Sequence, residues 1–346
     1  MTGDRARTAV WLAGAVAAVL ATLWVLSPTH DISAVLTAFW RGSLGTPSAL
    51  ISGTMVRAVP LALLGAGLCI AFRAGVFNIG GEGQLLLGAI AATAVGLGLG
   101  QFGPLSLLIA LALSAAAGAL WAGVAAGLRL RFGVLEVIST IMLNFVAANI
   151  VAYLVRGPLQ EPTDTYPQTE LIPAAARLPQ LIPDTRLHAG IVLAVLACLG
   201  GWWLLQRTAA GFRVRAIGAS PTAALAAGRI KVDRVAAGAL MTSGALGGLA
   251  GGVEVTGVTF ALYENLTPGY GFAAIAVAIL ARLRPQWVLA SAFLFAALET
   301  GALGMQRDAG VPSVVATAIE AVVILAAIGA GRAWRRVSPV AAGAAS

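Results

Sequence analysis

Residues 71–89 (AFRAGVFNIGGEGQLLLGA) place ionisable and amide side chains among glycines, between two long apolar runs. Arg73, Asn78, Glu82 and Gln84 could bind a polar solute through charge and hydrogen bonds. Such groups are costly among membrane-length apolar segments, so they often mark a solute pathway. Glycines allow the backbone to break, and a break at membrane depth persists only where it faces protein or water. We therefore predict a discontinuity beside a solute pathway; the alternative is a short cytoplasmic turn in which Arg73 pairs with Glu82.

A second Gly-rich interruption, TPGYGF, covers residues 267–272. Aromatic rings, amides and carboxylates near the two interruptions are side-chain types that would contact a polar solute. The candidates for the solute pathway are Phe77, Asn78, Glu82, Gln84, Asn144, Glu254, Tyr270 and Phe272. Each of them could equally be a packing residue whose polar atoms are satisfied inside the protein.

Three further chemical possibilities are weighed against the solute pathway. Glu254, Glu299 and Glu320 lie within or near apolar runs, where a carboxylate must pair, take up a proton or face water. Glu299 or Glu320 could therefore serve a proton-coupled secondary transporter, or be neutral or paired packing residues. For a membrane enzyme the sequence offers no paired carboxylates and no exposed nucleophile–base set. Cys69 and Cys198 fall inside apolar runs and lack metal-ligand spacing, so we expect no disulfide and no metal site.

The composition defines the elements that must position these residues. The 346-residue chain is 59% hydrophobic and only 10% charged, whereas soluble domains carry roughly 25% charged residues. The apolar runs are near twenty residues long and continuous, which predicts membrane-spanning helices instead of the alternating strands of a barrel. The net charge of +8 is explained by basic residues on the cytoplasmic side of a membrane, so we expect no nucleic-acid partner.

Ten transmembrane helices are predicted in a single permease-sized domain. They cover residues 9–26, 55–72, 82–99, 104–128, 136–155, 189–205, 235–256, 271–283, 286–305 and 311–331. Residues 156–188 read as an outer loop and 207–234 as a cytoplasmic loop. With both termini inside, six of the 22 Lys and Arg residues fall in outer segments and the other sixteen fall in inner ones. That asymmetry follows the positive-inside rule.

The two interruptions lie on opposite sides of the membrane in this topology, five spans apart. Paired interruptions in opposed halves indicate an inverted repeat with a site at its interface. We therefore predict that spans two to five and seven to ten are related by such a repeat. Glycines 244, 247, 248, 251 and 252 in span seven include pairs four residues apart, which predict close helix contact on one face.

The basic loop 207–234 contains a short predicted helix. Ser220 suits the N-cap, Pro221 suits the first helical position and Gly228 suits the stop. A helix of about two turns is unstable alone in water and needs a partner surface. One interpretation is docking into a cytoplasmic motor subunit; the alternative is contact with lipid headgroups, with the arginines binding phosphate. The candidate coupling residues are Arg213, Arg215, Gly218, Ser220, Pro221, Leu225 and Gly228.

Four segments carry a resemblance that extends over about residues 55–331. They are AFRAGVFNIGGEGQLLLGA, GVLEVISTIMLNF, RAIGASPTAALAAGRI and TPGYGFAAIAVAIL. Together they resemble the inner-membrane permease subunits of ABC importers of the branched-chain amino acid/ribose type. FNIGGEGQ is similar to the subgroup that takes up nucleosides, and the short helix after Ser220 is similar to that family's coupling loop.

The resemblance implies a transport subunit and not an enzyme. It would form the path for a nucleoside or related solute by alternating access, in a bacterial inner membrane with both termini cytoplasmic. The chain has no G-x-x-x-x-G-K-[ST] motif, so we expect no cofactor on this chain and ATP hydrolysis on a partner ATPase. The other partners implied are a second, homologous permease in a heterodimer, a substrate-binding lipoprotein or periplasmic receptor, and membrane lipid.

Overall fold

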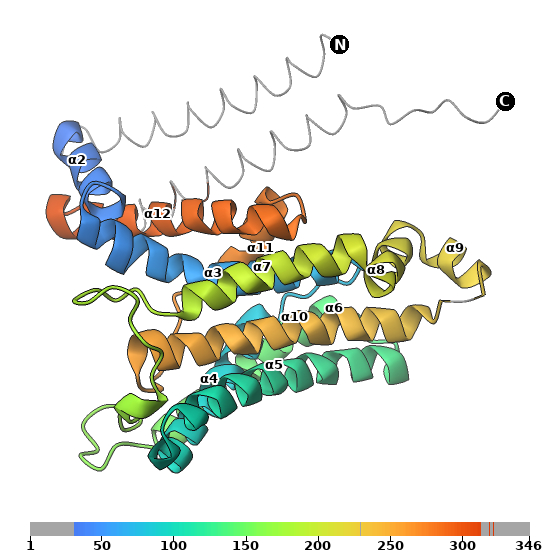
Figure 1. Cartoon of the computed structure of the whole chain (residues 1–346), viewed down its shortest axis with the longest axis horizontal. Coiled ribbons are helices and arrows are strands. Elements are labelled where there is room, and N and C mark those ends of the chain that lie inside the picture. The colour runs from blue at the N-terminus through green and yellow to red at the C-terminus, as the bar shows by residue number, and fades with distance from the viewer. Residues whose placement is uncertain (1–30, 229, 313–317, 319–320, 322–346) are drawn as a thin grey trace, which may run out of the picture. The chain divides into compact units, whose positions relative to one another are not determined.

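The computed structural model of the chain describes residues 31–228 and 230–312, together with residues 318 and 321. Over these residues the regular structure is helical, apart from two isolated β-bridges. The principal helices are α2 (Ile32–Ser43), α3 (Met55–Arg73), α4 (Gly81–Leu99), α5 (Pro104–Phe132), α6 (Glu136–Val155), α7 (Gly190–Arg207), α8 (Ala209–Ala219), α9 (Pro221–Ala226), α10 (Val232–Glu254), α11 (Tyr270–Leu280) and α12 (Pro285–Ala309). Figure 1 shows their arrangement.

Seven of the described helices, counted with adjoining helical turns, are long and apolar enough to cross a membrane. This finding confirms a polytopic all-α membrane protein. The predicted spans at 9–26 and 311–331 lie outside the described residues, apart from positions 311, 312, 318 and 321. Helix α11 occupies the place of the predicted span 271–283 but has only 11 residues. At about 1.5 Å per residue it covers roughly half of a bilayer core, so α11 alone does not cross.

Contacts divide the described residues into two compact units, and the first comprises residues 31–54 with 294–312. Within it, Asp31 caps α2 by accepting a hydrogen bond from the Ser33 backbone N–H at 2.9 Å. Val35 of α2 packs in a buried cluster with Met305 and Val311. The hydroxyls of Thr54 and Thr300 hydrogen-bond at 2.8 Å. Apolar packing and a buried hydroxyl pair therefore hold this unit together.

The second unit, Met55–Phe293, contains α10 at its centre, packed against α3, α4 and α5. Figure 1 shows α10 lying along α5. A methyl group added at Gly248 would overlap the backbone of Ser114 and Gly118, and one at Gly251 would overlap the Leu85 carbonyl. The predicted close contact through glycines four residues apart is thus confirmed. Small residues replace side-chain packing with direct backbone approach, as is typical of helix association in lipid.

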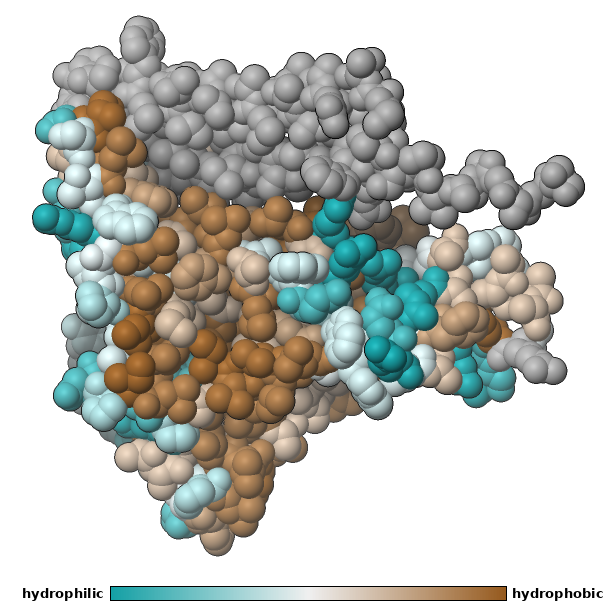
Figure 2. All heavy atoms as spheres, turned by 45° about the horizontal axis from the view of Figure 1, so that its top comes forward, coloured by the Kyte–Doolittle hydropathy of each residue, from teal (hydrophilic) through white to brown (hydrophobic). Residues whose placement is uncertain are grey.

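The outward faces of this second unit are apolar. In the most apolar stretch of α3, 78% of the residues are buried, against 22% for α5. The exposed residues of α5 include Leu105, Leu108 and Leu120. Figure 2 shows a broad hydrophobic surface bordered by hydrophilic side chains, including those at the end where α7 passes into α8. Such a surface suits contact with lipid or with another membrane subunit.

The loop at residues 156–189 is ordered by backbone hydrogen bonds to the connection after α10. Thr169 N–H donates to the Leu262 carbonyl at 2.9 Å, and Ile172 N–H donates to the Phe260 carbonyl at 2.8 Å. Arg156 forms an ion pair with Glu264. The hydrogen bonds that the Arg156 guanidinium donates to Glu264 hold the pKa of that carboxyl below its usual range. The loop and the connection therefore form one ordered layer at the same end of the second unit.

Candidate functional site

The interruption between α3 and α4 is a non-helical segment at residues 74–80, held by a buried amide pair. Asn78 Nδ2 donates to Gln84 Oε1 at 3.0 Å and to Ser243 Oγ of α10 at 2.9 Å. Asn78 Oδ1 accepts from Gln84 Nε2 at 3.0 Å and from the Gly80 N–H at 2.9 Å. All hydrogen-bonding atoms of the Asn78 amide are therefore satisfied inside the protein.

Helix α6 supplies the second set of contacts to the same segment. Asn144 Oδ1 accepts from the Gly83 N–H, and Asn144 Nδ2 donates to the Ile79 carbonyl, both at 2.9 Å. One turn earlier, Thr140 Oγ1 accepts from the Ile79 N–H at 3.3 Å. Because residues four apart share a helix face, Thr140 and Asn144 together bind the broken backbone on both sides of Ile79.

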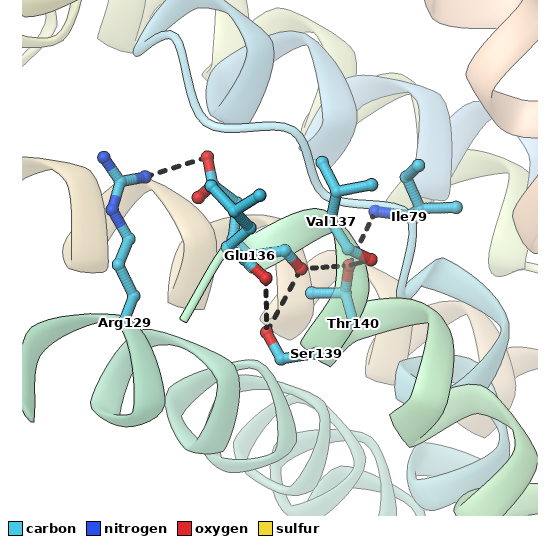
Figure 3. Close-up of polar contacts among 7 residues, drawn as sticks. Ile79, Arg129, Glu136, Val137, Ser139 and Thr140 are labelled. Atoms are coloured by element: carbon cyan, nitrogen blue, oxygen red, sulfur yellow. Dashed lines mark hydrogen bonds and ion pairs between the residues drawn. The ribbon is translucent and has the colours of Figure 1, made fainter. Parts of the chain in front are cut away.

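An ion pair fixes the start of α6 relative to α5. Arg129 Nη1 lies 2.9 Å from Glu136 Oε1, and Figure 3 shows the two side chains facing each other across the connection between these helices. The Glu136 carbonyl accepts a hydrogen bond from Thr140 Oγ1 at 2.6 Å. Figure 3 also shows Thr140 pointing from α6 toward the Ile79 backbone. Glu136, which sequence reasoning did not single out, thus anchors the helix that binds the interruption.

The two interruptions meet at Glu82. Its carboxylate accepts hydrogen bonds from the Thr267 hydroxyl and, at 2.7 Å, from the Gly271 N–H. Gly81 and Gly271 are in direct contact, and a side chain at Gly271 would overlap the Glu82 backbone. The N-termini of α4 and α11 therefore approach each other, with one carboxylate beside both. One of the carboxyl oxygens of Glu82 thereby accepts from a backbone N–H of the first turn of α11, one of the donors that a helix N-terminus leaves without an intrahelical partner.

The structure brings Asn78, Glu82, Gln84 and Asn144, four of the predicted pathway residues, together around the first interruption. Whether they contact a solute stays a prediction, because the hydrogen bonds they form in this structure are to the protein itself. Phe77 and Phe272 differ from this set, since these residues are 58% and 50% exposed. Tyr270 is buried at the start of α11.

Glu254 is not part of this cluster. It is buried at the C-terminal end of α10, eleven residues and hence about 16 Å along the helix from Ser243. Glu254 lies close to Tyr263 of the ordered loop layer. The pKa of the Tyr263 phenol is raised, first by burial and then by the negative charge of Glu254. Glu299 is half-buried in α12, and Glu320 lies outside the described residues. In the part of the chain that the structure describes, no group of three or more His, Cys, Asp and Glu side chains could hold a metal ion.

Sequence reasoning missed Ser243, Thr140 and Thr267. Hydroxyl residues are common in apolar helices, where they usually hydrogen-bond their own preceding turn, as Ser114 does to Ala110. Nothing local in the sequence distinguishes Ser243 or Thr140 from that ordinary role. Thr267 opens the TPGYGF segment, but its partner Glu82 is 185 residues away in the chain.

The short helix predicted after Ser220 is present as α9. Ser220 Oγ accepts from the Ala223 N–H at 3.2 Å, and Gly228 adopts φ = 71°, a left-handed conformation that glycine tolerates. Leu225 is 66% exposed, whereas Ala224 is buried. Arg213 is exposed and Arg215 half-buried on α8. These positions leave one face of α9 open while its other face packs on the protein.

Helix α8 connects α9 to the first interruption. Gly218 lies against the Arg73 carbonyl, so closely that an added methyl group would overlap it. One buried apolar cluster contains Ala224 of α9, Ile217 of α8 and Ala74 and Val76 of the interruption. The α8–α9 segment and the broken backbone are therefore in continuous contact.

Comparison with known proteins defines the class. The family model described as "Branched-chain amino acid transport system / permease component" matches residues 50–328. The chain therefore belongs to this family of membrane permease components. No solved structure matches it.

Three curated relatives are similar over most of their lengths. The glucose ABC transporter permease protein TsgB13 of Haloferax volcanii is 37% identical over 80% of this chain and 75% of its own. The guanosine ABC transporter permease protein NupP of Bacillus subtilis is 36% identical over 88% of this chain and 87% of its own. A second Bacillus subtilis protein, the guanosine ABC transporter permease protein NupQ, is 30% identical over 72% of this chain and 80% of its own.

Proposed function

We propose that this chain is the permease subunit of an ABC importer and forms the translocation path for a nucleoside or a related small polar solute. A separate ATPase subunit supplies the energy, and transport proceeds by alternating access. Membership of the permease family and the similarity to the guanosine and glucose permease proteins support the proposal. They favour it over proton-coupled transport through Glu299 or Glu320.

The contact between the α8–α9 segment and the first interruption carries the mechanism. The exposed face of α9 around Leu225 is the surface that the ATPase would bind. Its buried face shares an apolar cluster with Ala74 and Val76, and Gly218 lies on Arg73. Close-packed elements transmit small shifts because their interiors have little free space. Movement of α9 on ATPase closure would therefore displace the start of the interruption.

The solute path is proposed to run along the junction of α4 and α11. The exposed rings of Phe77 and Phe272 offer faces on which a base or sugar ring could stack. Asn78, Gln84 and Asn144 hold the first interruption in its observed conformation through hydrogen bonds to one another and to the backbone. Opening the path would exchange some of these partners for polar groups of the solute, so that no buried amide is left unpaired.

The finer topology belongs to the same proposal. Ten spans with both termini cytoplasmic place sixteen of the 22 basic residues inside. The non-helical residues before α11 would complete its crossing, as broken helices do where they line a protein-enclosed path. The meeting of the α4 and α11 N-termini supports an inverted repeat, in which interrupted helices from opposed halves face one site.

The expected assembly has two permease and two ATPase chains plus an external receptor, in a bacterial inner membrane. The existence of two guanosine permease proteins in Bacillus subtilis supports a heterodimer of homologous permeases. We expect this chain to bind no cofactor and the partner ATPase to bind ATP, because the sequence has no P-loop motif.

The test is ATP-dependent uptake by the complete complex in vesicles, with labelled guanosine and labelled glucose as alternative solutes. Gly218→Val should sharply reduce uptake per folded complex recovered, because the added side chain would overlap the Arg73 carbonyl and push α8 away from the first interruption. Ala219→Val is the matched control, since Ala219 is exposed on the same helix. Uptake that continues without the ATPase, or that a protonophore abolishes while ATP is maintained, would contradict the proposal.

A further inference from the structure

A basic recess of about 690 Å³ lies where the ends of α3 and α7 and the side of α8 meet the start of α12. Four arginines line it, namely Arg73, Arg207, Arg215 and Arg284. Trp202 and two glutamines complete the wall, which contains no acidic residue. Its size falls within the roughly 300–1,000 Å³ of small-ligand pockets. Because no carboxylate lines the recess, its positive charge would attract an anion from outside the wall.

Arg215 shows most directly that a partner is absent. Its Nη1 atom is buried and has no hydrogen-bond partner among the described residues. A buried charged donor without an acceptor is costly, and native proteins rarely leave one so. The carboxylates of the described chain form no ion pair with Arg207 or Arg284 either. An anion in the recess would satisfy the Arg215 donor and offset the repulsion among the arginines.

The recess is built from fixed parts. Arg73 Nε donates to the Leu283 carbonyl at 3.0 Å, and its Nη2 donates to the Arg282 carbonyl at 3.4 Å. Arg282 and Leu283 hold left-handed conformations, with φ values of 56° and 53°. This turn directly precedes Arg284. Arg73 therefore joins the end of α3 to the turn that brings Arg284 to the wall.

The position of the recess identifies the source of the anion. The membrane-spanning helices α3 and α7 end at Arg73 and Arg207, and α12 begins at Pro285. Their ends mark the level at which the hydrocarbon core gives way to lipid headgroups. Trp202 lies in the last turns of α7, and tryptophan is enriched at that level. Figure 2 shows hydrophilic side chains gathered where the hydrophobic surface ends beside α7 and α8.

We infer that this recess binds the phosphate headgroup of an anionic membrane phospholipid. Arginine binds phosphate oxygens in paired hydrogen bonds, and basic pockets between spanning helices suit such headgroups. Docking of a partner protein is the weaker assignment, because no residue of α9 lines the recess. Binding of the lipid would join α3, α7, α8 and α12 at one point beside the α8–α9 segment.

The experiment is native mass spectrometry of the purified full-length chain with phosphatidylglycerol and phosphatidylcholine of identical acyl chains. The test variant is Arg207→Gln with Arg284→Gln, both exposed side chains. The control is Arg131→Gln with Arg234→Gln, which are equally exposed, remove the same charge and do not line the recess. Each recess arginine should contribute roughly fivefold to binding, so the double variant should bind phosphatidylglycerol roughly 25-fold more weakly.

Preferential retention of phosphatidylglycerol, lost in the test variant and kept in the control, is the expected result. Equal retention of the two lipids, or an equal loss in test and control variants, would overturn the assignment. If the substitutions weaken only the binding of inorganic phosphate and leave lipid binding unchanged, the recess is a site for a soluble anion. Loss of ATPase co-purification with unchanged lipid binding would assign it to a protein partner. If the double variant misfolds, the single Arg207→Gln variant gives the same test with a roughly fivefold effect.

Discussion

Asn144 spans the first interruption with both ends of its amide, so its removal should be costly. Asn144→Leu keeps the size of the side chain but leaves the Gly83 N–H and the Ile79 carbonyl without their partner. A buried polar group left unpaired costs about 1–3 kcal/mol. We expect a clearly lower melting temperature for the full-length chain in detergent, measured by intrinsic fluorescence.

Asn149→Leu is the matched control for that prediction. Asn149 is exposed on the same helix, and its amide only donates to the Phe145 carbonyl at 2.8 Å. A helix carbonyl already serves its own backbone, so this loss should be small. Equal destabilisation by the two substitutions would show that Asn144 does not hold the interruption.

His188 should make the loop layer sensitive to acid. It is buried, its Nδ1 accepts from the Gly190 N–H at 3.2 Å, and burial, followed by the charge of Arg186, lowers its pKa from 6.5 to about 4. Between pH 6.5 and 4 the unfolded chain binds more protons at this residue than the folded one. The free energy of unfolding therefore falls as the pH is lowered through that window.

The measurement is the melting temperature of the purified chain at pH 7.5 and at pH 5. His188→Asn removes the titrating group and retains a side-chain acceptor, so it should reduce the pH dependence. The unsubstituted chain, measured under the same conditions, supplies the reference pH dependence. An unaltered pH dependence in His188→Asn would assign the acid sensitivity to other groups.

At the scale of whole helices, backbone contact between α10, α5 and α4 determines which substitutions the second unit tolerates. Gly248→Leu would drive a side chain into the backbone of Ser114 and Gly118. Overpacking of this kind typically costs about 1–3 kcal/mol, and more where backbones must separate. We expect a large loss of folded, monodisperse protein by size-exclusion chromatography of the detergent extract.

Gly238→Leu is the control on the same helix. A side chain at Gly238 meets open space, so this substitution should be tolerated and should raise helix propensity slightly. If both variants are recovered equally, close approach of the backbones is not required for folding.

Local signals in the sequence predicted some elements well. Glycines four apart predicted the contact face of α10, and Ser220, Pro221 and Gly228 predicted α9. The predicted span 271–283 runs three residues past the end of α11 at Leu280, because the helix ends in a turn where Arg282 and Leu283 adopt left-handed conformations unusual for their residue types. The link between Thr267 and Glu82 could not be predicted, since it depends on the folding of the chain between them.

At the scale of the whole molecule, the topology can be tested with single thiols. Both native cysteines, Cys69 and Cys198, are buried, so they should react poorly with a membrane-impermeant maleimide. Ala175→Cys lies in the loop at 156–189 and Ala227→Cys follows α9, and both positions are exposed. We expect labelling of Ala175→Cys in intact cells and of Ala227→Cys only after permeabilisation.

Labelling of both positions in intact cells would place α9 outside and remove its access to a cytoplasmic ATPase. The unsubstituted chain serves as the control for background labelling. Because each variant replaces an exposed alanine, neither substitution should disturb packing, and unchanged expression would verify that assumption.

The glycine crossing of α10 with α4 and α5 also bears on how the protein is made. Synthesis runs from the N-terminus, so Gly88 and Gly118 leave the ribosome well before Gly248. Until α10 arrives, the backbone of Ser114 and Gly118 lacks the helix that packs directly against it in the folded protein. A nascent chain stalled before residue 232 should therefore be recognised as incomplete by membrane proteases, while one released after residue 254 should escape them.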